Sequence, residues 1–466
     1  RGESWEKRSG YTATSPQYYH ELIPDPKNPD RFYAVDTFMS FSDDGGATMK
    51  RLPIPDVHVD SHALWIDPAD TDHLIQGNDG GLYETFDRAS WRHFENLPVM
   101  QFYRVALDNS WPFYNVYGGT QDNSTIGGPS RTTDRAGVTN EDWFVCVGGD
   151  GFEAAVDPQD PATVYCESQD GALTRFDRRS GEGTDIRPRE TPGDKPFVFN
   201  WDTPFLISPH QPNRLYLAGN FLFRSDDRGD SWTRISGDLT RGLDRNQLKV
   251  MGEIQKPEAP SKNLSTSIFG NAVSLTESPL VQGLLYVGTD DGLLHATDDG
   301  GTTWRKVESF PTIPDMTYLS DLEASRHKPD TLYASFENHK MGDFKPYILR
   351  SDDRGRTWKP ITGNLPERGP VYTLAEDHVN PNLLFCGTEY GAYFTTDGGE
   401  TWNKIGGLPT IAVRDLEIQR RDDDLALATF GRGFYLLHDY SPMRLTDAAA
   451  LDKPAHIFPI KPALSY

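Results

Sequence analysis

The chain has 466 residues, a formal net charge of −23, 36% hydrophobic residues and 12% aromatic residues. This length exceeds one core of ordinary size, so it predicts two domains or one large repeat architecture. The acidic surface excludes nucleic acid as a partner, because a phosphate backbone requires basic side chains. No apolar run reaches membrane-spanning length, so we expect no membrane insertion.

The chain begins inside its own repeated motif. Residues 1–10, "RGESWEKRSG", match residues 228–237, "RGDSWTRISG", but lack the preceding Ser-Asp-Asp. We therefore expect an upstream part of the same polypeptide, with residues 1–10 as the end of one repeat.

The pattern Ser/Thr-x-Asp-x-Gly-x-Ser/Thr-Trp recurs at 42–49, 225–232, 297–304, 351–358 and 395–402, with a shortened copy at 85–91. The aspartate is expected to accept hydrogen bonds from the turn, the glycine to supply a positive φ and the tryptophan to pack between neighbouring sheets. Trp5 and Trp91 are expected to pack in the same way. The residues assigned this structural role are Asp44, Asp227, Asp299, Asp353, Asp397, Trp232, Trp304, Trp358 and Trp402.

Each repeat contains two strands around an Asp/Pro-rich turn, then a third strand, the motif and a fourth strand. Four short strands every 42–45 residues predict an all-β fold built from the blades of a β-propeller. Residues 1–100 are expected to be the last blades of an N-terminally truncated propeller, and residues 101–466 a complete seven-bladed propeller. The alternative is one ring of ten blades. The predicted blades are 18–56, 60–98, 102–149, 150–196, 197–250, 268–315, 316–370, 371–411 and 412–466, with 455–460 as a fourth strand in the last.

Three aspartates are candidate catalytic residues, Asp79, Asp122 and Asp150. They lie near the junction of the predicted propellers, where a cleft would form, and Asp79 and Asp150 are flanked by glycines. A glycosidase requires two carboxyl groups roughly 5–10 Å apart, one as acid and the other as base or nucleophile. The alternative is that the Asp-Gly pairs form ordinary tight turns.

Several polar and aromatic side chains are candidate ligand-binding residues. "HVDSH" places His58, Asp60 and His62 two residues apart, which on an extended segment would put all three on one face; they are metal-ligand types, or else hydrogen-bonded caps. Trp65 and Trp201 are expected in innermost strands and therefore in the core. The remaining candidates are Gln121, Asn123 and Arg131, whose groups bind sugar hydroxyls or peptide backbone, and Trp111 and Trp143, which could stack on a sugar ring.

No cofactor is required by these groups. The acidic segment "QRRDDDLAL" (419–427) could bind a calcium ion or could be a solvated hairpin turn. Of the three cysteines, Cys146 and Cys166 could form one disulfide bridge or remain buried thiols, and Cys386 would be a free thiol.

The repeated motif resembles the Asp box, or bacterial neuraminidase repeat. Together with "HVDSHALWIDP" (58–68), "YGGTQDNSTIGGPSR" (117–131) and "GGDGFEAAVDP" (148–158), it makes the chain resemble large secreted bacterial Asp-box proteins described as sortilin-like or glycosyl-hydrolase-like. The resemblance implies a secreted, periplasmic or cell-surface location. It also implies binding of an extended ligand, carbohydrate or peptide, at a propeller mouth or the inter-propeller cleft. One alternative is a glycoside hydrolase similar to two-propeller xyloglucanases, and another is a structural module of a surface or secretion assembly.

Overall fold

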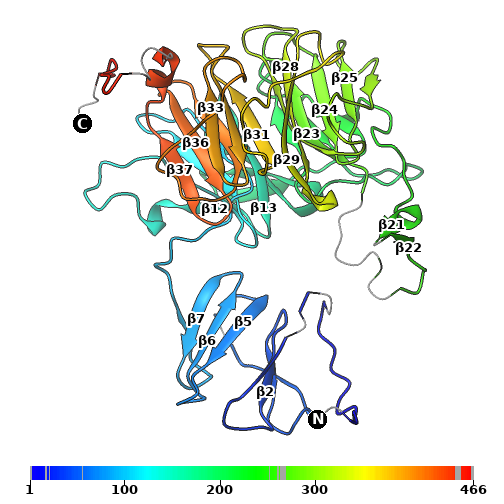
Figure 1. The fold of residues 1–466 in the computed structure, drawn as a ribbon, viewed down its shortest axis with the longest axis vertical. Coiled ribbons are helices and arrows are strands. Elements are labelled where there is room, and N and C mark those ends of the chain that lie inside the picture. The colour runs from blue at the N-terminus through cyan, green and yellow to red at the C-terminus, as the bar shows by residue number, and fades with distance from the viewer. Residues whose placement is uncertain are drawn as a thin grey trace. The chain divides into compact units, whose positions relative to one another are not determined.

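The computed structural model describes residues 3–15, 18–19, 21–54, 56–250, 252–259, 262, 269–446 and 453–462. The chain divides into two compact units, residues 1–99 with 255–266 (unit 1) and residues 100–254 with 267–466 (unit 2) (Figure 1). Each unit is described by itself. The assignment of residues 1–100 to a truncated upstream propeller, and of a cleft beside it, stays a prediction.

Unit 1 contains two four-stranded antiparallel sheets. Tyr33, Met39 and Leu74 are fully buried in the core that the two sheets share, and Trp91 packs at its edge. The strands are β1 (Leu22–Pro24), β2 (Phe32–Ala34), β3 (Ser40–Ser42) and β4 (Lys50–Arg51), then β5 (Ser61–Ile66), β6 (Leu74–Asn78), β7 (Gly81–Thr85) and β8 (Arg92–His93).

In its described residues, unit 2 contains seven antiparallel sheets of three or four strands, numbered here as blades 1 to 7 in chain order. Blade 1 is β9 (Ala106–Leu107), β10 (Asn115–Gly119), β11 (Thr125–Pro129) and β12 (Phe144–Val147); blade 2 is β13 (Gly151–Val156), β14 (Thr163–Ser168), β15 (Ala172–Asp177) and β16 (Glu182–Asp185); blade 3 is β17 (Phe205–Ile207), β18 (Leu215–Ala218), β19 (Leu222–Ser225) and β20 (Thr233–Arg234). Blade 4 is β23 (Ala272–Glu277), β24 (Leu285–Thr289), β25 (Leu294–Thr297) and β26 (Arg305–Val307); blade 5 is β27 (Tyr318–Ala324), β28 (Leu332–Asn338), β29 (Asp343–Ser351) and β30 (Lys359–Pro360). Blade 6 is β31 (Val371–Glu376), β32 (Leu384–Thr388), β33 (Gly391–Thr395) and β34 (Asn403–Lys404); blade 7 is β35 (Val413–Gln419), β36 (Asp424–Thr429) and β37 (Gly433–Leu437).

The other elements of unit 2 are short. A two-stranded hairpin, β21 (Lys249–Val250) and β22 (Glu253–Ile254), follows blade 3. The 3-10 turns are η1 (Asn140–Asp142), η2 (Gln169–Gly171), η3 (Arg245–Gln247), η4 (His339–Met341) and η5 (Ser441–Leu445). Among the described residues, no helix is long and apolar enough to cross a membrane.

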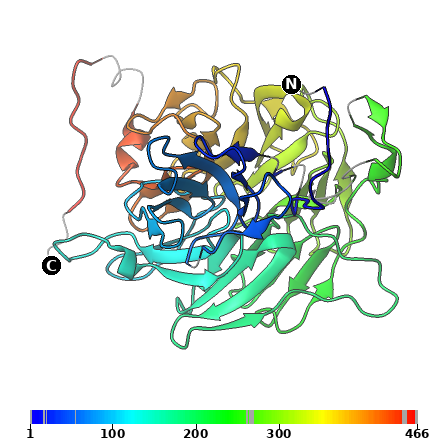
Figure 2. The same ribbon diagram turned by 90° about the horizontal axis from the view of Figure 1, so that it is seen from below.

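The seven blades close into a ring (Figures 1 and 2). The first strand of each blade contacts the first strand of the next, and the last of them, β35, contacts β9 of blade 1. The closure is reinforced by a bridge between Gln101 and Phe430 and by the Phe102 amide, which donates to the Thr429 carbonyl at 3.0 Å. The predicted seven-bladed propeller is therefore confirmed, and the alternative ring of ten blades is wrong.

Blade 7 has three strands in the described part of the chain, and the predicted fourth strand at 455–460 is wrong. Residues 453–462 form no strand, and Ile457 and Ile460 are 93% and 90% exposed. Pro454, Pro459 and Pro462 explain this, because proline cannot donate a backbone hydrogen bond to a neighbouring strand.

The box aspartate organises the turn between the third and fourth strands. In blade 3, Asp227 accepts hydrogen bonds from the Ser225 hydroxyl (2.7 Å), the Ser231 amide (2.9 Å) and the Ser231 hydroxyl (2.6 Å). In unit 1, the backbone amide and hydroxyl of Thr48 lower the pKa of Asp44 to about 2. The remaining box aspartates, Asp299, Asp353 and Asp397, accept the equivalent bonds in blades 4, 5 and 6.

The box also contacts the preceding blade through its tryptophan and its glycine. The indole nitrogens of Trp232, Trp304 and Trp402 donate to the carbonyls of Ile186 (2.6 Å), Ile235 (3.0 Å) and Ile361 (2.9 Å), which lie just after the fourth strands of blades 2, 3 and 5. The same isoleucines fill the space in which a side chain on the box glycine would stand, and the glycines concerned are Gly229, Gly301 and Gly399. We call this arrangement the box clamp.

Two of the box tryptophans do not form a box clamp. Trp358 donates instead to the Gly355 carbonyl of its own turn at 3.2 Å, and its ring packs edge-on against Phe310 of the preceding blade. Trp5 is 93% exposed, so the expectation that it packs between sheets is wrong.

We predict that Gly399→Ala destabilises unit 2 more than Gly407→Ala. Both glycines have a positive φ, +101° and +83°, so both alanines carry backbone strain. A Cβ at 399 would stand 2.7 Å from Cβ of Ile361, whereas nothing lies within 4 Å of one at 407. The additional loss of unfolding free energy at 399 should be roughly 1–3 kcal/mol, measured by denaturant unfolding. Equal losses would contradict the box clamp.

Candidate functional site

The two ends of the unit 2 ring carry different groups. The strand-start face is the end at which the first strands begin and at which the turns between second and third strands lie. The box face is the opposite end, with the Asp boxes and the turns between first and second strands. Because β10 runs from Asn115 to Gly119, residues 108–114 lie on the box face and residues 120–124 on the strand-start face.

Asp122 and Asp150 meet on the strand-start face. Oδ1 of Asp150 accepts a hydrogen bond from the Asp122 amide at 2.6 Å, and its Oδ2 accepts one from Nε2 of Gln169 at 3.0 Å. Asp150 is only 3% exposed, and burial together with the nearby charge and hydrogen-bonding carboxyl group of Asp122 raises its pKa. Both oxygens of Asp150 are thus hydrogen-bonded within the protein, and its carboxyl group is buried beneath the turn that carries Asp122.

Gln121 and Asn123 belong to the same turn. The Tyr103 hydroxyl donates to Oε1 of Gln121, and Nδ2 of Asn123 donates to the Gln121 carbonyl at 3.0 Å. Asp122 and Ser124 have φ values of +60° and +79°. The turn is thus held in a strained shape that presents its polar side chains beside Asp150.

The other predicted ligand residues of unit 2 lie on the box face. Arg131 follows β11 and pairs with Asp424 of blade 7 at 3.3 Å. Trp111 is 71% exposed beneath the Arg421 guanidinium, whose carbon lies 5.4 Å from the ring centroid, and Trp143 stacks on Phe434. Arg131 and Trp111 are therefore at the opposite end of the ring from Asp122 and Asp150. The Trp143 ring reaches back toward the strand-start face, because Phe434 lies near the start of β37 and stacks on Phe102.

The histidine segment lies in unit 1, and the expected extended backbone is interrupted. Asp60 has a φ of +61°, and the pairing of β5 with β6 shifts register between Ser61 and Ala63, so the three side chains do not share one face by alternation. Nε2 of His62 contacts Oδ1 of Asp79 at 3.0 Å, and the Tyr19 hydroxyl donates to Asp60. His58 instead bonds through Nδ1 with the Val59 carbonyl at 3.0 Å.

An aromatic row crosses the strand-start face. It runs from Trp201 of blade 3 through Phe152 of blade 2 (ring centroids 6.5 Å apart) to Tyr103 of blade 1 (4.7 Å) and Phe430 of blade 7 (5.1 Å). The Arg414 guanidinium carbon continues it, 5.5 Å from the Phe430 ring and 4.2 Å from that of Tyr372 in blade 6. Of these rings, Trp201 is 40% exposed, Tyr103 and Phe430 are half-buried, and Phe152 and Tyr372 are buried. Trp201 therefore offers the open ring on which an apolar sugar face can stack.

Trp201 is the functional candidate that sequence reasoning missed. It is 40% exposed, and Trp65 is 48% exposed, so the expectation that both lie in the core is wrong. Trp201 precedes β17, which begins only at Phe205, and therefore sits in a surface connection. The dipeptide "NW" ahead of "DTP" was the available signal, because Asp, Thr and Pro favour a turn before the strand.

A buried ionic cluster lies next to this row on the first strands. Arg104 pairs with Asp202 at 2.9 Å and lies 3.8 Å from Glu153. Oδ2 of Asp415 accepts the Val105 amide at 2.9 Å, which joins blade 7 to blade 1. Burial raises the pKa of Asp415 to about 7 and that of Glu153 well above its usual range, although Arg104 opposes both shifts. The cluster holds neighbouring blades together, and the carboxyl group of Asp415 is partly protonated near pH 7.

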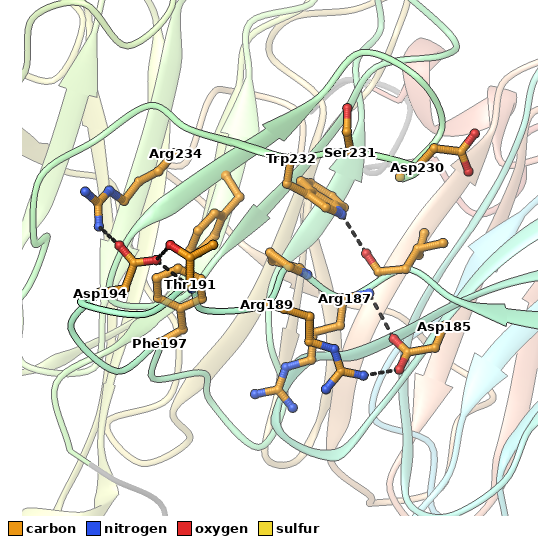
Figure 3. Close-up of a pocket in the computed structure, with 14 residues that line it drawn as sticks. Asp185, Arg187, Arg189, Thr191, Asp194, Phe197, Asp230, Ser231, Trp232 and Arg234 are labelled. Carbon is orange, nitrogen blue, oxygen red and sulfur yellow. Dashed lines mark hydrogen bonds and ion pairs between the residues drawn. The ribbon is translucent and has the colours of Figure 1, made fainter.

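A groove of about 520 Å³ lies elsewhere, between the end of blade 2 and the box of blade 3 (Figure 3). None of the predicted catalytic or ligand-binding residues lines it. Asp185 accepts the Arg187 amide (3.0 Å) and pairs with Arg189, and Trp232 reaches across to the Ile186 carbonyl. The groove is therefore formed around a box clamp, with its charges bonded to one another.

The acidic stretch 419–427 is occupied by cationic side chains. Asp422 pairs with Arg421 (2.8 Å), Asp423 with Arg444 (2.7 Å) and Asp424 with Nδ1 of His438 (2.8 Å). These partners neutralise the carboxylates that a calcium ion would need, so the donor set does not fit calcium as it stands.

Comparison with known proteins agrees with this architecture. Residues 393–404 match the model of the BNR/Asp-box repeat. The chain is similar to xyloglucanase Xgh74A of Acetivibrio thermocellus, 25% identical over 257 residues (47% of this chain and 28% of that protein). It is also similar to the xyloglucanases of Paenibacillus sp, 26% identical over 230 residues (43% and 21%), and of Hypocrea jecorina, 39% identical over 69 residues (13% and 8%).

The chain thus spans under a third of the length of the curated relatives it matches. Among solved structures, it is similar to the Pan2 WD40 domain of Neurospora crassa, with a TM-score of 0.47 and 13% identity over 72% of this chain and 88% of that one. The fold and its boxes define an Asp-box β-propeller protein. Its sequence is related to that of xyloglucanases.

We predict that Asp290→Asn changes the pH dependence of stability. Asp290 lies on the strand-start face, where burial raises its pKa from 3.8 to about 7 despite bonds from the Gly270 and Asn271 amides, with Asp291 and Lys340 nearby. A raised carboxyl pKa adds stability that is complete below about pH 4 and lost as the pH rises to about 7. Oδ1 accepts both amides (3.0 and 2.9 Å), so asparagine can keep these bonds without the charge.

The Asp290→Asn variant should therefore match the wild type at pH 4 and exceed its unfolding free energy at pH 8 by roughly 2–4 kcal/mol. Denaturant unfolding at the two pH values measures this difference. A variant less stable than the wild type at pH 8 would contradict the raised pKa.

Proposed function

We propose that unit 2 binds an extended polysaccharide on its strand-start face. The single observation that carries this proposal is the aromatic row from Trp201 to Tyr372, which crosses blades 3, 2, 1, 7 and 6. Trp201 exposes its ring at one end of the row, and the half-buried Tyr103 and Phe430 lie further along it, on blades 1 and 7. These three rings are the ones that successive apolar faces of a sugar chain can contact.

Polar groups beside the row supply hydrogen bonds to hydroxyls. Gln121, Asp122 and Asn123 form the turn next to Tyr103, and Asp150 with Gln169 lies beneath it. Amide and carboxylate groups both donate to and accept from sugar hydroxyls according to their protonation state. The raised pKa of Asp150 favours its protonated form, which can donate a hydrogen bond as well as accept one.

The relatives suggest the class of sugar. The similar proteins from Acetivibrio thermocellus, Paenibacillus and Hypocrea jecorina are named xyloglucanases, so a xyloglucan-type polysaccharide is the ligand proposed here. The proposed binding requires no cofactor. A secreted, periplasmic or cell-surface location follows from a polysaccharide ligand of this kind and is part of the proposal.

We predict that Trp201→Ala weakens binding of xyloglucan oligosaccharides about tenfold, a loss of roughly 1.4 kcal/mol. The matched control is Trp111→Ala, which removes a more exposed indole from the box face (71% against 40% exposed). Isothermal titration with the full chain measures both variants. The proposal fails if the two variants bind alike, or if a peptide library binds and glycans do not.

Hydrolysis is the second candidate function, favoured by the names of the relatives. Asp150 is 3% exposed, and its two oxygens are bonded to the Asp122 amide and to Gln169, which does not suit a carboxyl group that exchanges protons with a bound sugar. We therefore expect Asp122 and Asp150 to position the ligand. Asp79, in unit 1, remains the third predicted catalytic carboxylate.

The test is release of reducing ends from a panel of glucans by the wild type and by Asp79→Asn, Asp122→Asn and Asp150→Asn. As a binding protein, the wild type should release none while retaining affinity. A true hydrolase would lose turnover by several orders of magnitude in one variant with little change in binding. Such a loss would show that the protein is a glycoside hydrolase and would overturn the proposal that it only binds the polysaccharide.

A further inference from the structure

The box clamps are confined to one arc of the ring. Blades 3, 4, 5 and 6 carry complete boxes, each reaching toward the blade before it. The corresponding turns of blades 1, 2 and 7 contain no complete box within the described residues. The interface between blades 4 and 5 has a box but no clamp, because Trp358 bonds within its own turn. Three neighbouring interfaces, between blades 6 and 7, 7 and 1, and 1 and 2, lack a complete box in the described residues and must be held by other interactions.

Polar bonds replace the clamp at two of them. Arg444 of blade 7 holds Asp377 of blade 6 through two nitrogens at 2.7 and 2.8 Å, and the Tyr440 hydroxyl donates to the same carboxylate at 2.7 Å. Between blades 7 and 1, Asp424 accepts the Tyr114 hydroxyl at 2.9 Å, and Nε2 of Gln419 donates to the Asp108 carbonyl at 2.6 Å.

The interface between blades 1 and 2 is held differently. Arg178 of blade 2 donates to the Tyr117 hydroxyl of blade 1 at 2.8 Å and lies over the Phe144 ring at 4.4 Å. Beside this contact are two thiols, Cys146 on β12 and Cys166 on β14. They share one apolar cluster, and the two strands contact each other.

We propose that Cys146 and Cys166 form a disulfide that ties blade 1 to blade 2 in place of the missing box clamp. The observation behind this proposal is that two of the three cysteines of the chain come from different blades and are buried in one cluster. Both are free in the structure, and the bridge would close a loop of about 20 residues.

The oxidation requires a dithiol–disulfide oxidant such as glutathione disulfide. Cys146 reacts first, because it is 7% exposed on the outermost strand of its blade, whereas Cys166 is fully buried. Its thiolate attacks the oxidant, forms a mixed disulfide and releases one glutathione thiolate. The Cys166 thiolate then attacks the sulfur of Cys146 and displaces the second glutathione thiolate. Two protons and two electrons leave the cysteines, and one glutathione disulfide becomes two glutathiones.

Cys386 provides the matched control. It is fully buried in blade 6, in a cluster with Leu374 and Tyr393, so it resembles Cys166 in burial but belongs to another interface. A general effect of oxidation or of losing a buried thiol would appear at Cys386 as well.

The experiment refolds the full chain in a glutathione redox buffer and alkylates the remaining thiols under denaturing conditions. One thiol should be alkylated, and non-reducing peptide mapping should join the peptides containing residues 146 and 166. Dithiothreitol should lower the midpoint of thermal unfolding by roughly 3–8 °C. This drop should persist in Cys386→Ala and vanish in the double variant Cys146→Ala with Cys166→Ala.

Three alkylated thiols after oxidation, or a bridge that includes Cys386, would overturn the proposal. So would a dithiothreitol effect that survives in the double variant. If the double variant does not fold, the thiol count and the peptide map of the wild type decide the question by themselves.

Discussion

The contact between one blade and the next is the constraint on which this structure depends. A four-stranded sheet with two apolar faces is not stable alone, so each blade must be held against both neighbours. The Asp box does this with one short turn, in which an aspartate fixes the loop, an indole bonds the carbonyl of an isoleucine in the blade before it, and a glycine leaves room for that side chain. The ring closes where β35 contacts β9, at one of the three interfaces that lack a complete box in the described residues.

The arc without box clamps is also the arc that carries the candidate site. Asp122 and Asp150 belong to blades 1 and 2, and the middle of the aromatic row, from Phe152 through Tyr103 to Phe430, lies on blades 2, 1 and 7. Blades held by ion pairs and buried side chains are not bound to a fixed turn sequence. Their loops are therefore free to present functional side chains, while the boxed blades supply the scaffold.

The fold could be predicted largely from sequence because the box is local: eight consecutive residues contain every group that the turn requires. The site could be predicted only in part. The polar turn at Gln121, Asp122 and Asn123 was apparent from its residue types, but its partner Asp150 was one of several Asp-Gly pairs. Trp201 was assigned to the core, because its exposure depends on where β17 begins. Arg131 and Trp111 were grouped with Asp122 because sequence distance does not show which end of a strand a loop occupies.

The sequence by itself determined the number of blades in unit 2 and the structure of each box turn, because both follow from interactions within about 45 residues. Only the tertiary structure decided which residues meet across the ring, as in the contact of Tyr103 with Phe430 and of the Val105 amide with Asp415. The physical reason is closure. Residues hundreds of positions apart become neighbours when the last blade docks on the first, and no local pattern records that meeting.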